Sequence, residues 1–294
     1  MKTKLAVGDS LFDLVNTILQ VALFFIMAYP LYYIVIASVS EPNEVLTGKV
    51  FLFPKGFQMD SYKRVFENQD ILRGYANTIF YTITGTLINL AVTLPCGYTL
   101  SRRDLRGRSW LMMLFSFTMF FGGGMVPGYM IVKHLKLLNT VWALLLPGAM
   151  SVWNMIICRN FFESNIPKEL LEVSRIDGCR NFTFFVRIIL PLSKALIAVM
   201  TLFYAVGHWN SYFSALLYLT DRTKYPLQLL LRNILIASQP LNPGTTLSDQ
   251  SALFRMIEML KYALVVVSSL PVLILYPFVQ KHFVQGVMIG SIKG

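Results

Sequence analysis

Charged residues are scarce in this 294-residue sequence. Asp, Glu, Lys and Arg make up 14% of it and hydrophobic residues 55%, whereas roughly 25% charged residues is usual for a soluble domain. This deficit excludes a water-soluble globule of this size. The hydrophobic residues instead form runs long enough, at about 20 residues, to cross the hydrocarbon core of a bilayer. We therefore predict an all-α polytopic membrane protein with six transmembrane helices, over residues 15–38, 75–99, 110–132, 141–161, 196–219 and 263–280.

The sequence also lacks the residue patterns of metal sites and of common enzymes. Its 3 cysteines and 3 histidines are spread along the chain without a CxxC pair, which excludes a zinc site and a disulfide framework. The GxxxxGK[ST] phosphate loop is absent, so the chain cannot hydrolyse ATP by that route. HExxH and GxSxG are absent too, and no predicted span holds a carboxylate pair. We predict no catalytic residue, no metal and no cofactor in this chain.

Acidic residues are fewer than basic ones, 15 against 26. In a soluble protein this surplus would indicate nucleic acid, but here the basic residues are scattered among loops, with no groove of stacked aromatic residues. We expect them to meet anionic lipid on the cytoplasmic face of the membrane, and we expect no nucleic-acid partner.

The orientation in the membrane follows from the loops. The first hydrophobic run follows two lysines, as in a signal peptide, but it is longer than the roughly 7–15 apolar residues of such a segment. We predict an uncleaved helix over 15–38 after an interfacial lead-in over 1–14. The short loop SRRDLRGRS (101–109) holds four arginines, and short loops rich in Lys and Arg stay cytoplasmic. Six spans then place both termini, the tail 281–294 and the insert 162–195 in the cytoplasm.

The insert is polar, although hydrophobic runs flank it. Pro167 suits the first turn of a helix, and no helix breaker follows until Gly178, which is a natural left-handed cap. Asn181 can cap a second, apolar helix, and Pro191 marks the bend into the next span. The simplest interpretation treats Glu169 and Glu172 as solvated charges on a surface helix.

The spacing within the insert resembles the EAA loop of permease subunits of ABC importers. That loop has a Glu, two small residues, a Gly four positions after the second of these, nine intervening residues, and then Ile-x-Leu-Pro. The matching residues here are Glu172, Gly178, Ile188, Leu190 and Pro191. The chain departs from the pattern at Val173 and Ser174, where the family has alanines. It also has Ala195 where many carbohydrate permeases have a further proline.

The resemblance covers nearly the whole chain. FLFPKGFQMDSYKRVF (51–66) looks like the outer loop of the sugar permeases, and FVQGVMIGSIKG (283–294) is similar to their C-terminal tail. The stretch MFFGGGMVPGYMIVKHLKLLNTVWALLLP (119–147) most resembles the subgroup for complex polysaccharides and uronate oligosaccharides, related to the maltose permeases. The fold implied is that of a type I importer permease, with its core over 75–280.

The resemblance implies a division of labour between several chains. Residues 163–191 would form a coupling loop whose short helix docks into a cleft on a cytosolic ATPase, with Glu172 pairing with an arginine there. The positions implied in coupling are Glu172, Ser174, Asp177, Gly178, Leu190 and Pro191. The implied partners are a second, homologous permease chain, two copies of an ATP-binding subunit that hold ATP and Mg, and an extracytoplasmic solute-binding protein. The implied cargo is a sugar, an oligosaccharide by subgroup, crossing a bacterial plasma membrane.

Polar residues inside the spans are candidates for the substrate path. Tyr204, His208 and Tyr212 share one face of a predicted helix, with Asn210, Ser211 and Ser214 nearby. Aromatic rings and hydrogen-bonding groups suit a sugar, although such stripes are more often packing. His208 has no intramembrane carboxylate to pair with as a proton carrier.

The predicted span 110–132 contains a second feature that can be interpreted in two ways. Gly124 and Gly128 form a GxxxG pattern that permits close helix packing, while Pro127 can mark a kink or the end of the span. A stand-alone secondary transporter or channel is the alternative function. It would need ionisable residues at mid-membrane or an inverted repeat, and neither is evident in the sequence.

Overall fold

A computed structural model describes residues 7–237, 257 and 260–274, and this part of the chain is helical, with no β-strand. The chain divides into two compact units, one formed by residues 1–68 and 233–269 and the other by 69–232 and 270–294. Each unit has its own helices and its own core. The all-α prediction is confirmed.

The first unit begins with α1 (Val7–Ser38) and continues with α2 (Pro42–Leu46) and α3 (Asp60–Glu67). A small core joins the end of α1 to the segment after it, and its buried residues are Ile36, Ala37, Val45 and Val50. The predicted lead-in before residue 15 is not a separate element, because α1 runs without a break from Val7. The part from Phe12 to Ser38 is long and apolar enough to cross a membrane.

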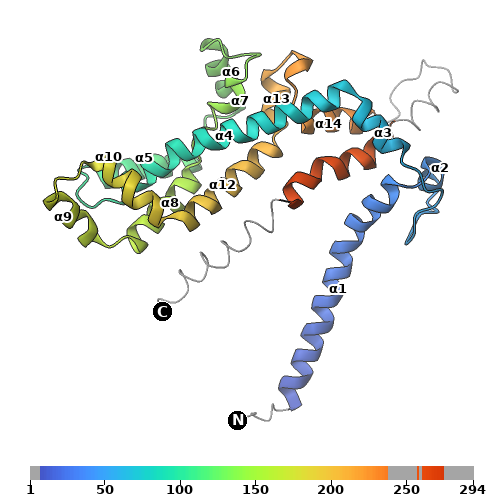
Figure 1. The fold of residues 1–294 in the computed structure, drawn as a ribbon, viewed down its shortest axis with the longest axis horizontal. Helices are drawn as coiled ribbons and strands as arrows, with labels where there is room; N and C mark the ends of the chain where they lie inside the picture. Colours follow the sequence, from blue (N-terminus) through green and yellow to red (C-terminus); the bar gives the residue numbers. More distant parts are fainter. Residues whose placement is uncertain (1–6, 238–256, 258–259, 275–294) are drawn as a thin grey trace. The chain divides into compact units, whose positions relative to one another are not determined.

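The second unit is built around α4 (Gln69–Ser101), α8 (Val152–Asn165) and α12 (Lys194–Trp209), and α4 packs against both of the others. Figure 1 shows α4 as the long helix along which the other elements of this unit are arranged. These other elements are α5 (Arg108–Phe120), α6 (Met125–His134), α7 (Trp142–Leu145), α9 (Lys168–Ile176), α10 (Asn181–Phe184), the π-helical turn Phe185–Ile189, α11 (Leu190–Leu192), α13 (Phe213–Tyr218) and the 3₁₀ turn Arg222–Lys224. The helix α14 (Leu227–Ala237) begins in this unit.

Glycines allow the central helices to approach closely. A Cβ atom on Gly97 of α4 would lie 2.7 Å from the Cβ of Cys158 and 3.2 Å from backbone atoms of α8. A Cβ atom on Gly85 would collide with the His208 ring of α12. At these two positions of α4, a side chain larger than hydrogen would force the neighbouring helix to shift.

Three of the predicted spans are not continuous helices. The span 110–132 is broken into α5 and α6, which are bent by 112°. The span 141–161 is interrupted between α7 and α8, and 196–219 is interrupted between α12 and α13. The first break contains Gly124, whose φ of 86° is accessible mainly to glycine. Pro127 lies within α6 and neither kinks nor ends the span, so the GGG run is the breaking element.

Among the described residues, two helices are long and apolar enough to cross a membrane, or up to four if each bent pair is one span. The described part of the predicted span 263–280 lies in a shorter apolar helix, Leu260–Ile274. The remainder of that span and the tail 281–294 lie outside the described residues. The count of six spans stays a prediction.

Candidate coupling surface and membrane hollow

The insert folds as a short helix that ends in a glycine turn. The helix α9 begins after Pro167, and Gly178 follows it with a φ of 70°. The Gly178 N–H donates to the Arg175 carbonyl at 3.1 Å, and the Cys179 N–H donates to the Ser174 carbonyl at 2.9 Å. These two bonds form a Schellman motif, which satisfies carbonyls that the end of a helix leaves unpaired. The predicted left-handed turn is confirmed, and it fixes the exit direction of the chain.

One face of α9 packs against the rest of the unit. Ser174 is buried, and its hydroxyl donates to the Leu171 carbonyl at 2.8 Å. Val173 beside it is 57% exposed. This difference explains the departure from the family's pair of alanines. The buried position keeps a small residue, and the exposed position has room for a larger one.

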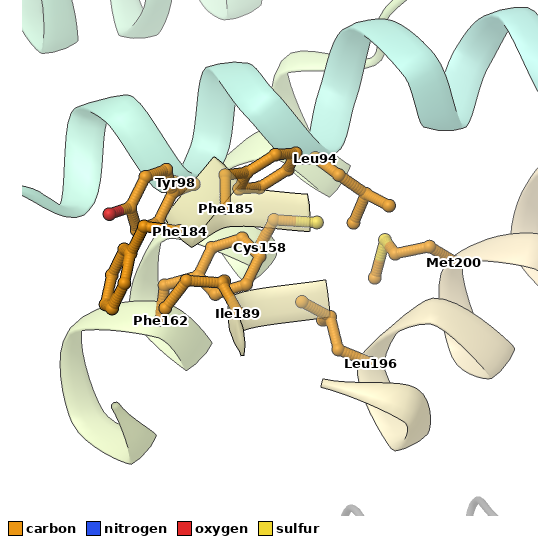
Figure 2. Packing of buried hydrophobic residues seen from close by; sticks show 9 residues of the cluster. All are labelled: Leu94, Tyr98, Cys158, Phe162, Phe184, Phe185, Ile189, Leu196 and Met200. Atoms are coloured by element: carbon orange, nitrogen blue, oxygen red, sulfur yellow. The ribbon is translucent and has the colours of Figure 1, made fainter. Parts of the chain in front are cut away.

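A hydrophobic cluster anchors the segment that follows the glycine turn (Figure 2). It joins α4 and α8 to α10, the π-helical turn and α12, and its buried members are Leu94, Tyr98, Cys158, Phe162, Phe184, Phe185, Ile189, Leu196 and Met200. Leu171 of α9 and Leu190 pack against its edge. The insert is therefore fixed to the core of the second unit rather than suspended from it.

Two details of this second helical segment differ from prediction. Arg180, not Asn181, precedes α10, and Asn181 is its first residue, so Asn181 does not cap the helix. The sharp bend lies at Ser193, between Leu192 and Lys194, where the helix axes turn by 85°. Pro191 stands two residues before it, inside α11, where a missing N–H is tolerated.

Asp104, in the turn after α4, connects the insert to that helix. Its carboxylate accepts two hydrogen bonds from Arg102, at 2.9 and 2.6 Å, and one from Arg175 of α9 at 2.5 Å. Arg102 also donates to the Asn181 side-chain oxygen at 2.9 Å. The Arg102 guanidinium, with Arg175 adding to it, holds the pKa of the Asp104 carboxyl well below its usual range. These four residues, the Asp104 junction, were not predicted as a set.

A second carboxylate ties α5 to α8 close by. Glu163 accepts from Arg108 at 2.7 Å and pairs with Arg159 at 2.9 Å. The hydrogen bond from Arg108 lowers the pKa of the Glu163 carboxyl. The arginines of the predicted cytoplasmic loop thus include two that hold neighbouring helices together.

The outward face of α9 is apolar and acidic. Ile176 is 85% exposed, and Leu170 and Val173 are exposed near it. Glu169 and Glu172 are also exposed, and neither forms an ion pair with a residue that the structure describes. A hollow of about 200 Å³ lies between α9 and the α4–α5 turn, and Glu172 contributes to its lining. Asp177, also exposed, ends the helix.

A separate hollow of about 410 Å³ lies among α4, α7, α12 and α13. Its polar lining residues are Asn89, Tyr204, His208, Ser211, Ser214 and Tyr218. His208 Nε2 lies 2.6 Å from Asn89 Oδ1, and the Tyr204 hydroxyl lies 2.7 Å from that of Thr93. Tyr204 and His208 are therefore held by α4 as well as lining the hollow.

The other two residues predicted for a substrate path lie elsewhere. The helix α12 ends at Trp209, so Tyr212 is beyond it and does not share a helical face with Tyr204 and His208. Asn210 is exposed, and its side chain donates to the Val206 carbonyl at 3.0 Å. Neither residue lines the hollow, whereas Ser211 and Ser214 do.

Sequence comparison identifies the family. The profile of the family described as "binding-protein-dependent transport system inner membrane component" matches residues 6–289. The chain belongs to this family. It is therefore a membrane permease component of such a transport system and not an ATPase, which agrees with the missing phosphate loop.

Individual relatives refine the resemblance. Protein LplC of Bacillus subtilis (strain 168) is 44% identical over 96% of this chain and 95% of its own length. The polygalacturonan/rhamnogalacturonan transport system permease protein YtcP of the same organism is 43% identical over 92% of this chain and 93% of its own. A chain from the crystal structure of a bacterial ABC transporter that imports the acidic polysaccharide alginate superimposes with a TM-score of 0.87. It is 34% identical, and the match covers 96% of this chain and 100% of that one.

These matches confirm that the chain resembles the ABC-importer permeases of the carbohydrate type, and in particular their polysaccharide subgroup. They also confirm the type I importer fold. The roles expected for individual residues stay predictions.

Proposed function

We propose that this permease carries an oligosaccharide across the bacterial plasma membrane and that α9 receives the work of ATP hydrolysis from separate subunits. The observation that carries the proposal is the construction of α9. The helix is capped by the Gly178 turn, packed on the hydrophobic cluster and tied to α4 through Asp104, while its outward face exposes Ile176 and Glu172.

A helix so held transmits displacement to the core rather than absorbing it. The exposed apolar residues suit a groove on a partner, and an unpaired carboxylate beside them suits an arginine at its edge. We propose that the partner is a cytosolic ATP-binding subunit, which would hold ATP and Mg. Two copies would serve this chain and a second, homologous permease chain.

We infer the class of cargo from the relatives. One is named for polygalacturonan and rhamnogalacturonan, and another belongs to an importer of the acidic polysaccharide alginate. An oligosaccharide with acidic sugar units is the cargo that these names favour for this chain. The hydroxyl, amide and imidazole groups around the 410 Å³ hollow can hydrogen-bond a sugar. A solute-binding protein outside the membrane would deliver it, and both termini of this chain would lie in the cytoplasm.

The test is to purify the tagged chain from its native membrane, identify the proteins that accompany it, and measure ATP hydrolysis with the loaded binding protein. Glu172→Ala should reduce the stimulated rate about tenfold or more, because removal of one partner of a charge pair at an interface commonly costs that much. Glu169→Ala is the matched control, since it removes the same charge from the same exposed face of α9 and so separates a specific pair at Glu172 from the general negative charge of the helix.

Equal rates for the wild type and Glu172→Ala would contradict the docking role of α9. A chain that purifies alone and moves solute without ATP would contradict the importer itself and favour a secondary transporter.

A further inference from the structure

We propose that the start of α5 carries a binding site for the phosphate headgroup of an anionic lipid. A hollow of about 700 Å³ opens there, and it shares Arg103 with the 200 Å³ hollow under α9 but has no other lining residue in common with it. Its lining combines three arginines with a serine and apolar side chains, namely Arg103, Arg108, Arg159, Ser109, Trp110 and Met112. The inference depends only on the chain being a membrane protein. It does not depend on what the protein transports.

The charges around the hollow do not balance. Arg108 and Arg159 share the single carboxylate of Glu163, at 2.7 and 2.9 Å. Arg103 is exposed and forms no ion pair with any residue that the structure describes. The nearest other acid in the sequence, Asp104, is occupied by Arg102 and Arg175 and does not line the hollow. An anion bound in the hollow would balance this surplus of positive charge.

The donor groups suit a phosphate. Guanidinium groups present planar pairs of N–H donors that match phosphate oxygens, and their hydrogen bonds are charge-assisted. The Ser109 hydroxyl lines the same space. The first turn of α5, which also lines it, has no side-chain cap at Gly107, and backbone N–H groups at the start of a helix favour negative charge.

The apolar surface beside the arginines points to a lipid rather than to free phosphate. None of the 13 residues of α5 is buried within the described part of the chain. Trp110 is 67% exposed and Phe117 is 55% exposed. Tryptophan favours the boundary between headgroups and acyl chains. A lipid whose phosphate lies among the arginines can lay its acyl chains along α5, whereas inorganic phosphate would leave that surface uncovered.

The experiment uses the intact transporter in neutral detergent and counts bound lipids by native mass spectrometry. Phosphatidylglycerol is added in steps, and phosphatidylcholine serves as the neutral lipid. Arg103→Gln should weaken phosphatidylglycerol binding about fivefold, which is the effect of one basic residue at an anionic membrane surface. Arg106→Gln is the matched control, because Arg106 is exposed in the same loop but does not line the hollow. It should leave the affinity unchanged.

Three results would overturn the assignment. An equal loss in both variants would show diffuse attraction to the basic loop rather than a site. Equal binding of phosphatidylcholine would show that the headgroup charge is not recognised. Displacement of phosphatidylglycerol by millimolar inorganic phosphate, lost in Arg103→Gln, would assign the hollow to free phosphate. None of these measurements uses ATP or sugar, so their outcome is separate from that of the proposed function.

Discussion

Gly178 follows α9 with a left-handed backbone, and nothing lies within 4 Å of the place a Cβ atom would take. Any cost of substitution therefore comes from the backbone and not from a clash. We expect Gly178→Ala to destabilise the turn by about 1 kcal/mol and Gly178→Asn by less, because asparagine tolerates this conformation. Hydrogen exchange of the amides from Asp177 to Cys179 measures the effect. The same protection in all three proteins would contradict the assignment of strain to this position.

Asp104 gives a prediction about pH. Its pKa is lowered in the folded protein by Arg102 and Arg175, so the stabilisation is present above the unfolded value of about 3.9 and is lost as the pH falls below it. We expect Asp104→Asn to increase hydrogen exchange in α9, by an amount that is constant from pH 5 to 8. The difference from the wild type should shrink below about pH 4, because the carboxylate released when α9 opens is then protonated, while the paired carboxylate stays ionised to lower pH.

Asp60→Asn is a suitable control, because Asp60 is exposed in the first unit and forms no ion pair among the described residues. A difference between Asp104→Asn and the wild type that grows with acid would have the wrong sign for this junction.

Single residues differ in how far the sequence alone could place them. Gly178 was predictable because helix formers precede it and its role depends only on its neighbours in the chain. The Asp104 junction was not, because 71 residues separate Asp104 from Arg175, and any of several loop arginines could have been the partner. The capping prediction for Asn181 was wrong for the same reason. Arg102, distant in the sequence, donates a hydrogen bond to the side chain that the local pattern assigns to capping.

At the scale of helices, the contact between α4 and α8 depends on Gly97. Gly97→Ala would place a methyl group 2.7 Å from the Cβ of Cys158 and 3.2 Å from two backbone atoms of α8, which cannot move independently of that helix. We expect a loss of about 1–3 kcal/mol, as for other overpacked cores, seen as a lower midpoint of thermal denaturation. The matched change Gly207→Ala in α12 meets nothing within 4 Å. If it lowers the midpoint as much as Gly97→Ala does, close packing is not the cause.

The breaks within the spans show the limit of hydropathy. The segments between α5 and α6 and between α12 and α13 remain apolar or uncharged, so a window of about 20 residues averages over them. Pro127 gave a local signal for a kink, and Gly124 with Gly128 gave the alternative of close packing by GxxxG, so the sequence did not assign the break to the glycine run. Only the backbone, bent by 112° there, distinguishes the two.

The orientation of the whole molecule is open to direct measurement. We expect a cysteine at Lys55 to react with a membrane-impermeant maleimide on intact cells, and a cysteine at Arg106 to react only after permeabilisation, because Arg106 lies in the arginine-rich loop predicted to be cytoplasmic. Both positions are exposed, and the background lacks the three native cysteines 96, 158 and 179. The reverse pattern would invert the topology and place α9 on the wrong side for a cytosolic partner.

Composition was enough to predict an integral membrane protein, because a chain with so few charged residues cannot cover its surface for contact with water. The family followed from one spaced motif, which works because the loop must keep its glycine turn whatever cargo the transporter carries. The membrane hollow was predicted only in part. Tyr204, His208 and the nearby serines 211 and 214 line it as the sequence suggested. Tyr212 does not, because the break at residues 210–212 takes it off the helical face that an unbroken helix would have given it.

Through the Asp104 junction, α9 is attached to one end of the long helix α4, so that α4 can act as a lever. A helix of 33 residues is about 50 Å long, so a tilt of about 10° at one end displaces the other by about 9 Å. Near its far end, Asn77 donates to the Thr223 carbonyl at 2.8 Å and Tyr81 to the Lys224 carbonyl at 2.8 Å. A push on α9 of a few ångströms is therefore connected, through one continuous helix, to the turn Arg222–Lys224 of the second unit.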